Sequence, residues 1–271
     1  MTSTRPGDGA HAGERRLWRV AALLSALLVV AAAAWQLRAD GSAHSGVIRG
    51  GSGGRTVAAV EIVGGEAKVT VTARADHEVG YRADIGWAFT RPTVEESWLG
   101  DTLRLTPHCG DDTVVLRVGL GCAVRLAVTV PTGIPLRVAG SSGRISVSGL
   151  EGTVDAATDS GTLTLAGLRG ALRAHVGSGT LIATGLASRQ ADIRAGAGRA
   201  EARFLTPPDA VTAAVGAGRL DLTLPPESRY RVDCRAGLGR CDADGSLSDP
   251  ASASTLDLSA GAGHVKAVHG S

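Results

Sequence analysis

The C-terminal half of the sequence repeats a short glycine-containing segment about every 20 residues. In each copy, apolar and polar residues alternate on both sides of the glycine. The repeated glycines are Gly143, Gly161, Gly179, Gly198, Gly218, Gly239 and Gly263. The intervals between them are 18, 18, 19, 20, 21 and 24 residues. A period in this range is typical of stacked supersecondary units, each of which needs its neighbours to bury an apolar face.

Three positions of each repeat are almost wholly apolar: two and four residues after the glycine, and five residues before it. The first of these positions holds Ile145, Leu163, Leu181, Ala200, Leu220, Cys241 and Val265. Alternation with a period of two indicates strands with one buried face, joined at a glycine corner. The pattern predicts an all-β ectodomain built as a repeat β-solenoid or β-roll. The same alternation would also permit an antiparallel β-sandwich.

A single long apolar run occupies residues 17–37 and predicts one N-terminal transmembrane helix. Trp18 and Trp35 lie near its two ends, and Arg15 and Arg16 precede it. The positive-inside rule then places residues 1–16 in the cytoplasm as a short tail. We therefore expect a single-pass cell-membrane protein whose C-terminal domain is extracytoplasmic. A cleaved signal peptide is the alternative for the apolar run, and it would export the same domain.

The remainder divides into three regions by composition. Residues 38–55 are rich in Gly and Ser, which predicts a flexible linker. Residues 56–139 are expected to form an N-terminal β region of the ectodomain, and residues 140–271 form the glycine-punctuated β-repeat region.

The four cysteines all follow the apolar run, in a compartment that favours disulfides. Cys109 and Cys122 flank a predicted strand at residues 113–118. Cys234 and Cys241 lie in inward columns on opposite sides of one glycine corner. We predict the disulfides Cys109–Cys122 and Cys234–Cys241, with buried free thiols as the alternative.

Charged residues recur at outward positions of the later repeats. Arg199, Arg219 and Arg240 directly follow their glycines, and Glu201, Asp221 and Asp242 follow two residues later. If the repeats stack, these six residues form a ladder of two adjacent columns. Cross-rung ion pairs are the simplest interpretation. A ligand-binding stripe and a catalytic face are the alternatives.

The sequence contains no pattern that predicts an enzyme, a cofactor or a metal site. The glycine pairs lack the third glycine and the helix of a dinucleotide site, and the cysteine spacings do not match a zinc site. A net charge of +2 does not favour nucleic acid as a partner. Four aromatic residues, Tyr81, Trp87, Phe89 and Trp98, cluster in the N-terminal β region. They are interpreted as a small aromatic core, with a sugar-stacking platform as the alternative.

The repeat also resembles a known family. The segments that carry the likeness are GSSGRISVSGL at residues 140–150, SGTLTLAGL at 160–168 and GSGTLIATGL at 177–186. They resemble a bacterial family of unknown function with β-strand repeats, whose members bear the provisional label of adhesins. The resemblance covers roughly residues 56–268. It implies a membrane-anchored β-repeat ectodomain in a bacterial envelope and no known catalytic residues. After Gly198 the pattern departs from the cleanest repeats, because Ala replaces Ser and the loops lengthen.

These observations lead to three functional hypotheses. The first is a non-catalytic, membrane-anchored cell-envelope protein with a structural or adhesive ectodomain, whose partner is a cell-wall polymer or a membrane protein. The second is an envelope-stress or signalling accessory that acts through a membrane partner. A β-helix carbohydrate-active enzyme is the remote alternative.

Overall fold

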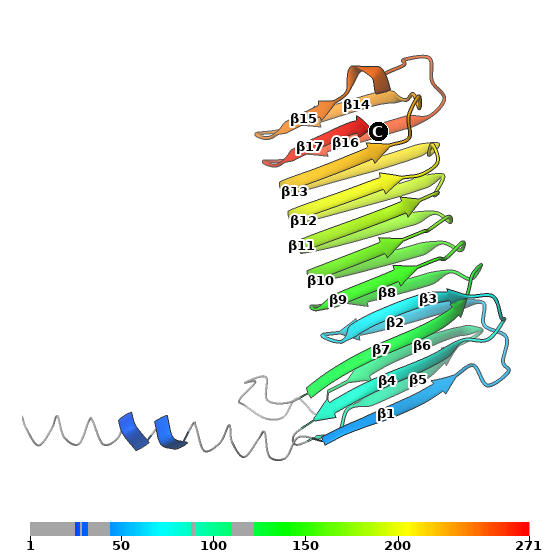
Figure 1. The fold of residues 1–271 in the computed structure, drawn as a ribbon, viewed down its shortest axis with the longest axis vertical. Coiled ribbons are helices and arrows are strands. Elements are labelled where there is room, and N and C mark those ends of the chain that lie inside the picture. Colours follow the sequence, from blue (N-terminus) through cyan, green and yellow to red (C-terminus); the bar gives the residue numbers. More distant parts are fainter. Residues whose placement is uncertain (1–24, 28, 32–43, 88–89, 110–121, 271) are drawn as a thin grey trace, which may run out of the picture.

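The computed structural model describes residues 25–27, 29–31, 44–87, 90–109 and 122–270. Within these residues the fold is all-β, as predicted, and its strands join in one mixed sheet (Figure 1). The six described residues of the predicted transmembrane span are helical, while the rest of the span lies outside the described residues. No described helix has both the length and the apolar character needed to cross a bilayer.

The repeat region is a stack of parallel strands in register. Its strands are β8 (Leu136–Gly140), β9 (Arg144–Ser148), β10 (Val154–Ala166), β11 (Leu172–Leu186), β12 (Gln190–Phe204) and β13 (Ala210–Leu224). Val154 pairs with Leu172, Leu172 with Ala191 and Ala191 with Val211. These offsets of 18, 19 and 20 residues equal the spacings of the glycine repeat. The repeat strands are therefore not an antiparallel meander.

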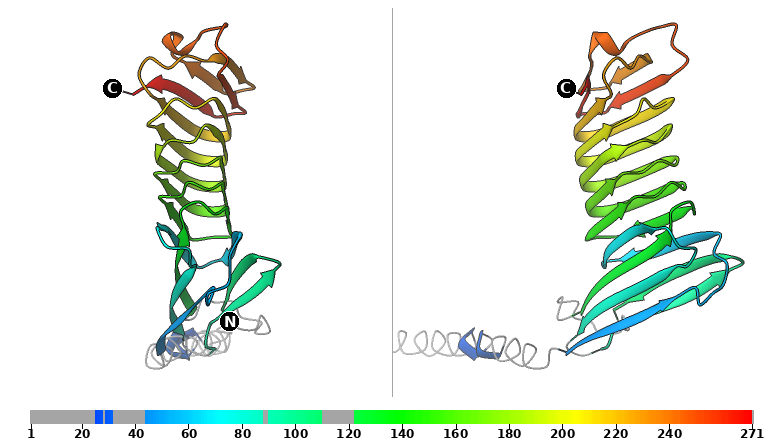
Figure 2. Two further views of the ribbon diagram at one scale, coloured as in Figure 1. Left: turned by 90° about the vertical axis from the view of Figure 1, so that its right-hand side faces the viewer. Right: turned by 45° about the vertical axis from the view of Figure 1, so that its right-hand side comes forward.

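Each long strand bends at its glycine and contributes to two walls that face each other (Figure 2). We name the halves before the glycine the first wall and the halves after it the second wall. β8 pairs with the first half of β10 and β9 with its second half. The core lies between the walls, and the predicted apolar columns fill it. Leu163, Leu181, Ala200 and Leu220, for example, are all fully buried.

We call each repeat of the stack a rung. The glycine corners of neighbouring rungs are in contact. Gly161, Gly179, Gly198 and Gly218 pair directly in the parallel register. Gly179 has a φ of +133°, and a Cβ there would lie 2.1 Å from the carbonyl oxygen of Gly161. Only glycine fits this corner, because a side chain would meet backbone that cannot move without breaking the stack.

The N-terminal β region continues the same two walls downward. Its strands are β1 (His44–Gly51), β2 (Ala59–Gly65), β3 (Lys68–Arg74), β4 (Gly80–Trp87), β5 (Thr93–Leu99), β6 (Thr102–His108) and β7 (Cys122–Pro131). β2 pairs in parallel with β8, and β3 with β9, so they form one further rung. Below them the pairing becomes partly antiparallel, in β1–β4, β4–β7 and β5–β6.

One sequence expectation fails in this region. His44–Gly51 lies within the predicted flexible linker, yet it forms β1 and pairs with all of β4. The neighbouring strand supplies backbone hydrogen bonds that composition alone does not reveal. The glycines of β1 also have a packing role, because a Cβ at Gly50 would lie 2.3 Å from Oε1 of Glu96. The predicted strand at residues 113–118 lies outside the described residues.

The last two repeats stack in the reverse of their sequence order. They comprise β14 (Arg231–Ala236), β15 (Arg240–Ala243), the 3-10 helix η1 (Gly245–Leu247), β16 (Thr255–Ala260) and β17 (His264–His269). β16 and β17 pair with β13 on one side and with β14 and β15 on the other. The repeat that is last in the sequence is therefore not the last of the stack. The rung of β14 and β15 ends the stack, as the top of Figure 1 shows.

Candidate binding face

The predicted arginine column lies on the outward side of the second wall. Arg199 pairs directly with Arg219 in the register of β12 and β13. The next residue along the column is His264 of β17, and only then comes Arg240 of β15. The structure thus brings Arg199 and Arg219 together but separates Arg219 from Arg240. The reason is the reversed order of the last two rungs.

The carboxylate column is interrupted in the same way. Glu201 pairs with Asp221, but Lys266 lies between Asp221 and Asp242. The ammonium group of Lys266 therefore replaces a third neighbouring carboxylate. The sign therefore alternates from Asp221 through Lys266 to Asp242, which relieves repulsion in this part of the column, while Glu201 and Asp221 remain adjacent like charges.

The ion pairs of this face only partly follow the predicted cross-rung pattern. Arg219 Nε lies 3.0 Å from Asp221 Oδ1 on the same strand. His264 Nε2 lies 2.8 Å from Asp242 Oδ2 across a rung. Arg199 makes no ion pair with any described residue and is exposed. Arg240 likewise makes no ion pair with any described residue and is exposed. The guanidinium groups of Arg199 and Arg240 are therefore accessible to a ligand without first breaking an ion pair among the described residues.

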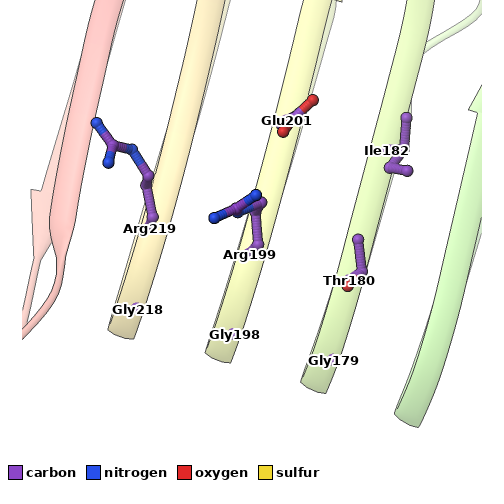
Figure 3. Close-up of a pocket in the computed structure, with 8 residues that line it drawn as sticks. All are labelled: Gly179, Thr180, Ile182, Gly198, Arg199, Glu201, Gly218 and Arg219. Carbon is purple, nitrogen blue, oxygen red and sulfur yellow. The ribbon is translucent and has the colours of Figure 1, made fainter.

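A shallow groove of about 620 Å³ lies over this part of the second wall (Figure 3). It is lined by Gly179, Thr180, Ile182, Gly198, Arg199, Glu201, Gly218 and Arg219. Gly179, Gly198 and Gly218 lie at one end of it, and Arg199, Glu201 and Arg219 follow on the neighbouring strands β12 and β13. Three of the six predicted ladder residues thus line one groove. Asp221, Arg240 and Asp242 do not line it.

The first wall carries a more regular charge column that the sequence analysis did not identify. Its successive members are Arg104, Glu61, Arg137, Asp155, Arg173 and Asp192, one from each neighbouring strand. The sign alternates at every step, and Arg104 Nη2 lies 2.8 Å from Glu61 Oε2. The sequence signal that could have identified this column is the spacing of 18 to 19 residues between Arg137, Asp155, Arg173 and Asp192. Because every charge has an opposite neighbour, this column stabilises the stack and offers little to a ligand.

The predicted aromatic cluster lies at the N-terminal end of the stack. Tyr81 is buried, whereas Trp87 and Trp98 are half-buried against the edge of the core. Phe89 lies outside the described residues. The hydroxyl of Tyr81 donates a hydrogen bond to Oε1 of Glu96, at 2.5 Å. Burial and this carboxylate raise the pKa of Tyr81 above its ordinary value.

Both predicted disulfides are present. Cys109 bonds Cys122, and Cys234 bonds Cys241, each with a Cα–Cα distance of 5.8 Å. Cys234 is paired in register with the buried Leu258, as its inward column requires, yet it is exposed. The cause is its position on the terminal strand β14, beyond which the described residues form no further rung. The disulfide therefore joins the two strands of this terminal rung covalently. The neighbouring rungs have buried aliphatic side chains at the same positions.

The described residues contain no cluster of three or more His, Cys, Asp or Glu side chains that could hold a metal ion. One carboxyl has a shifted pKa with a local cause. The backbone amide and hydroxyl of Ser246 donate to Asp244 and lower its pKa. This contact caps η1, so its origin is structural.

Comparisons with known proteins show only distant likeness. No family profile matches the chain, and no curated protein matches its sequence. A solved structure of a proposed adhesin from Bacteroides fragilis is similar at 12% identity and a TM-score of 0.45, over 82% of this chain and 97% of the other. A proposed cell adhesion protein from Clostridium sporogenes is 11% identical, with a TM-score of 0.33, over 84% and 100%. A proposed lipid-binding protein from Parabacteroides distasonis is 12% identical, with a TM-score of 0.37, over 84% and 97%. At such identities and TM-scores, the residues of this chain must support a functional interpretation by themselves.

Proposed function

We propose that this chain is a non-catalytic, membrane-anchored cell-envelope protein. A β-solenoid ectodomain, displayed outside the membrane, has a structural and adhesive role. The groove over β11, β12 and β13 binds an acidic cell-wall polymer. The anchor is the apolar run at residues 17–37, and the rigidity of the ectodomain comes from the in-register ladder.

The observation that carries the binding proposal is the direct stacking of Arg199 on Arg219 along an exposed groove. Neighbouring strands lie about 4.8 Å apart, so Arg199 and Arg219 are like charges in directly opposed positions, and Asp221 offsets only the charge of Arg219. Guanidinium groups bind carboxylates and phosphates through paired hydrogen bonds. An acidic group of an extended polymer would pair with Arg199, and a neighbouring acidic group could share Arg219 with Asp221.

The binding proposal is tested by co-sedimentation of the full chain, held in lipid nanodiscs, with isolated cell walls. Arg199→Glu/Arg219→Glu should abolish most of the saturable binding, because the groove then repels acidic groups. The matched control is Arg229→Glu/Arg231→Glu, which makes the same change of charge at exposed positions outside the groove. An equal loss in both variants would contradict a groove-specific site.

A second outcome would redirect the proposal. If the wild-type chain does not bind walls but retains a particular membrane protein from solubilised membranes, the adhesive role is wrong. The signalling-accessory hypothesis would then be favoured.

A further inference from the structure

The N-terminal end of the stack has two outermost strands, one in each wall. In the described part of the chain, β1 pairs only with β4, and β5 pairs only with β6. Each therefore presents a backbone edge with unpaired hydrogen-bonding groups. Figure 1 shows β1 at the end opposite the terminal rung of β14 and β15. Natural β proteins protect such edges with charges or covering segments, so the residues at this end are informative.

Tryptophans close the interior at this end. Trp98 of β5 is paired with the fully buried Leu103, so it points inward between the walls. Trp87 lies over Gly46 of β1, where a Cβ would be only 3.3 Å from its ring. Both rings are half-buried, so each packs against the core and keeps part of its surface exposed.

Each tryptophan also carries a cationic group on its face. The guanidinium of Arg55 lies 4.0 Å from the ring centroid of Trp98, and that of Arg91 lies 5.5 Å from Trp87. The imidazole of His44 stacks on Trp87 with ring centroids 5.6 Å apart. Indole rings beside arginine heads are the combination that proteins place at the membrane–water interface, where the ring meets the acyl boundary and the cation meets phosphate.

The chain that precedes β1 determines how far this end can be from a bilayer. Only residues 38–43 separate the predicted span from His44, the first residue of β1. Six residues reach at most about 20 Å when fully extended. The polar layer on one side of a bilayer is about 5–8 Å thick. The linker expected from composition, residues 38–55, would have allowed about 60 Å.

We infer that the N-terminal end of the stack rests on the bilayer that anchors the chain. Trp87 and Trp98 lie in the headgroup region, and Arg55 and Arg91 contact lipid phosphates. This surface is distinct from the groove of the second wall, and the inference rests on the membrane anchor of the proposed function. The stack then stands on the membrane by its N-terminal end, with β14 and β15 farthest from it.

The test uses the full chain reconstituted in vesicles that contain a headgroup-labelled, short-range fluorescence quencher. The four tryptophans of the chain are reduced to Trp87 and Trp98 by Trp18→Phe/Trp35→Phe. The expected result is strong quenching of these two residues and a blue-shifted emission relative to the protein in urea. The matched control adds Trp87→Phe/Trp98→Phe/Leu238→Trp. Leu238 is 95% exposed beside β14, so its reporter should remain unquenched.

The possible failures are distinguishable. Extraction of the protein from vesicles by alkaline carbonate would overturn the anchor, and with it the proposed function. Retention in the membrane without quenching of Trp87 and Trp98 would overturn only the resting surface. Equal quenching of the Leu238→Trp reporter would also overturn it, because the stack would then lie flat. In vesicles with acidic lipids, Arg55→Glu/Arg91→Glu should reduce quenching, whereas Arg229→Glu/Arg231→Glu should not.

Discussion

Single glycines determine whether the rungs of this protein can approach each other. At Gly179 a positive φ and contact with the carbonyl oxygen of Gly161 coincide. The same contact recurs at Gly198 and Gly218, each against the glycine of the preceding rung. A substitution at such a corner must move backbone in two rungs, whereas a few glycines, such as Gly133, lie in open space.

Gly179→Ala should lower the free energy of unfolding by about 2 kcal/mol or more, because its Cβ has no room. The matched control is Gly133→Ala, where no atom lies within 4 Å of an added Cβ. We expect the control to change stability by about 0.5 kcal/mol or less. Chemical denaturation of both variants measures this difference. Equal stability of the two variants would show that the corner is not constrained as described.

The Tyr81 hydroxyl makes the stability of the N-terminal end of the stack depend on pH in the alkaline range. Its pKa is raised first by burial and then by the hydrogen bond to Glu96. The folded-state pKa is above the unfolded value of about 10. The contribution of Tyr81 to the free energy of unfolding is therefore complete below pH 10 and is lost as pH rises through the folded-state pKa. Tyr81→Phe should therefore cost about 1 kcal/mol at pH 7 and flatten the decline above about pH 10. Denaturation at several pH values measures this; an unchanged alkaline decline would contradict it.

Among the elements, the terminal rung of β14 and β15 depends most on its disulfide. Only β16 and β17 pair with it in the described part of the chain. Cys234 is exposed, and Val232, Cys241 and Ala243 are only partly buried. Apolar burial therefore contributes less here than in the interior rungs, and the covalent link compensates for it.

Cys234→Ser/Cys241→Ser should destabilise this rung selectively. Cross-linking a loop of this size stabilises a chain by about 2–3 kcal/mol in the entropic account. Hydrogen exchange should accelerate in Arg231–Ala236 and Arg240–Ala243, while β10, β11 and β12 keep their protection. A uniform acceleration along the whole stack would contradict this local role.

The sequence predicted the interior elements better than the ends. Ile145, Leu163 and Leu181 lie where their period requires, because each repeat meets an equivalent neighbour. The insertion of β16 and β17 below β14 could not be predicted, since Cys241 and Val265 fit either order. β1 was missed because its ladder is supplied by β4, which is distant in sequence. The insertion of β16 and β17 also separated Arg240 and Asp242 from the other four residues of the predicted charge ladder.

At the scale of the whole molecule, the two walls extend from β1 and β5 to β14 and β15. The second wall alone contains β1, β4, β7, β3, β9, β10, β11, β12, β13, β17 and β15 in this order. At about 4.8 Å per step, these ten steps span about 48 Å. A stack of this length places its terminal rung of β14 and β15 well away from the bilayer if the chain is anchored as proposed.

The proposed function requires the stack to be displayed outside the membrane. This requirement is tested most directly by antibody labelling of intact, wall-stripped cells that produce the full chain with one epitope before Met1 and another after Ser271. We predict that the C-terminal epitope is labelled without permeabilisation, and the N-terminal epitope only after it. Labelling of both epitopes only after permeabilisation, or of the N-terminal epitope alone in intact cells, would contradict the proposed function.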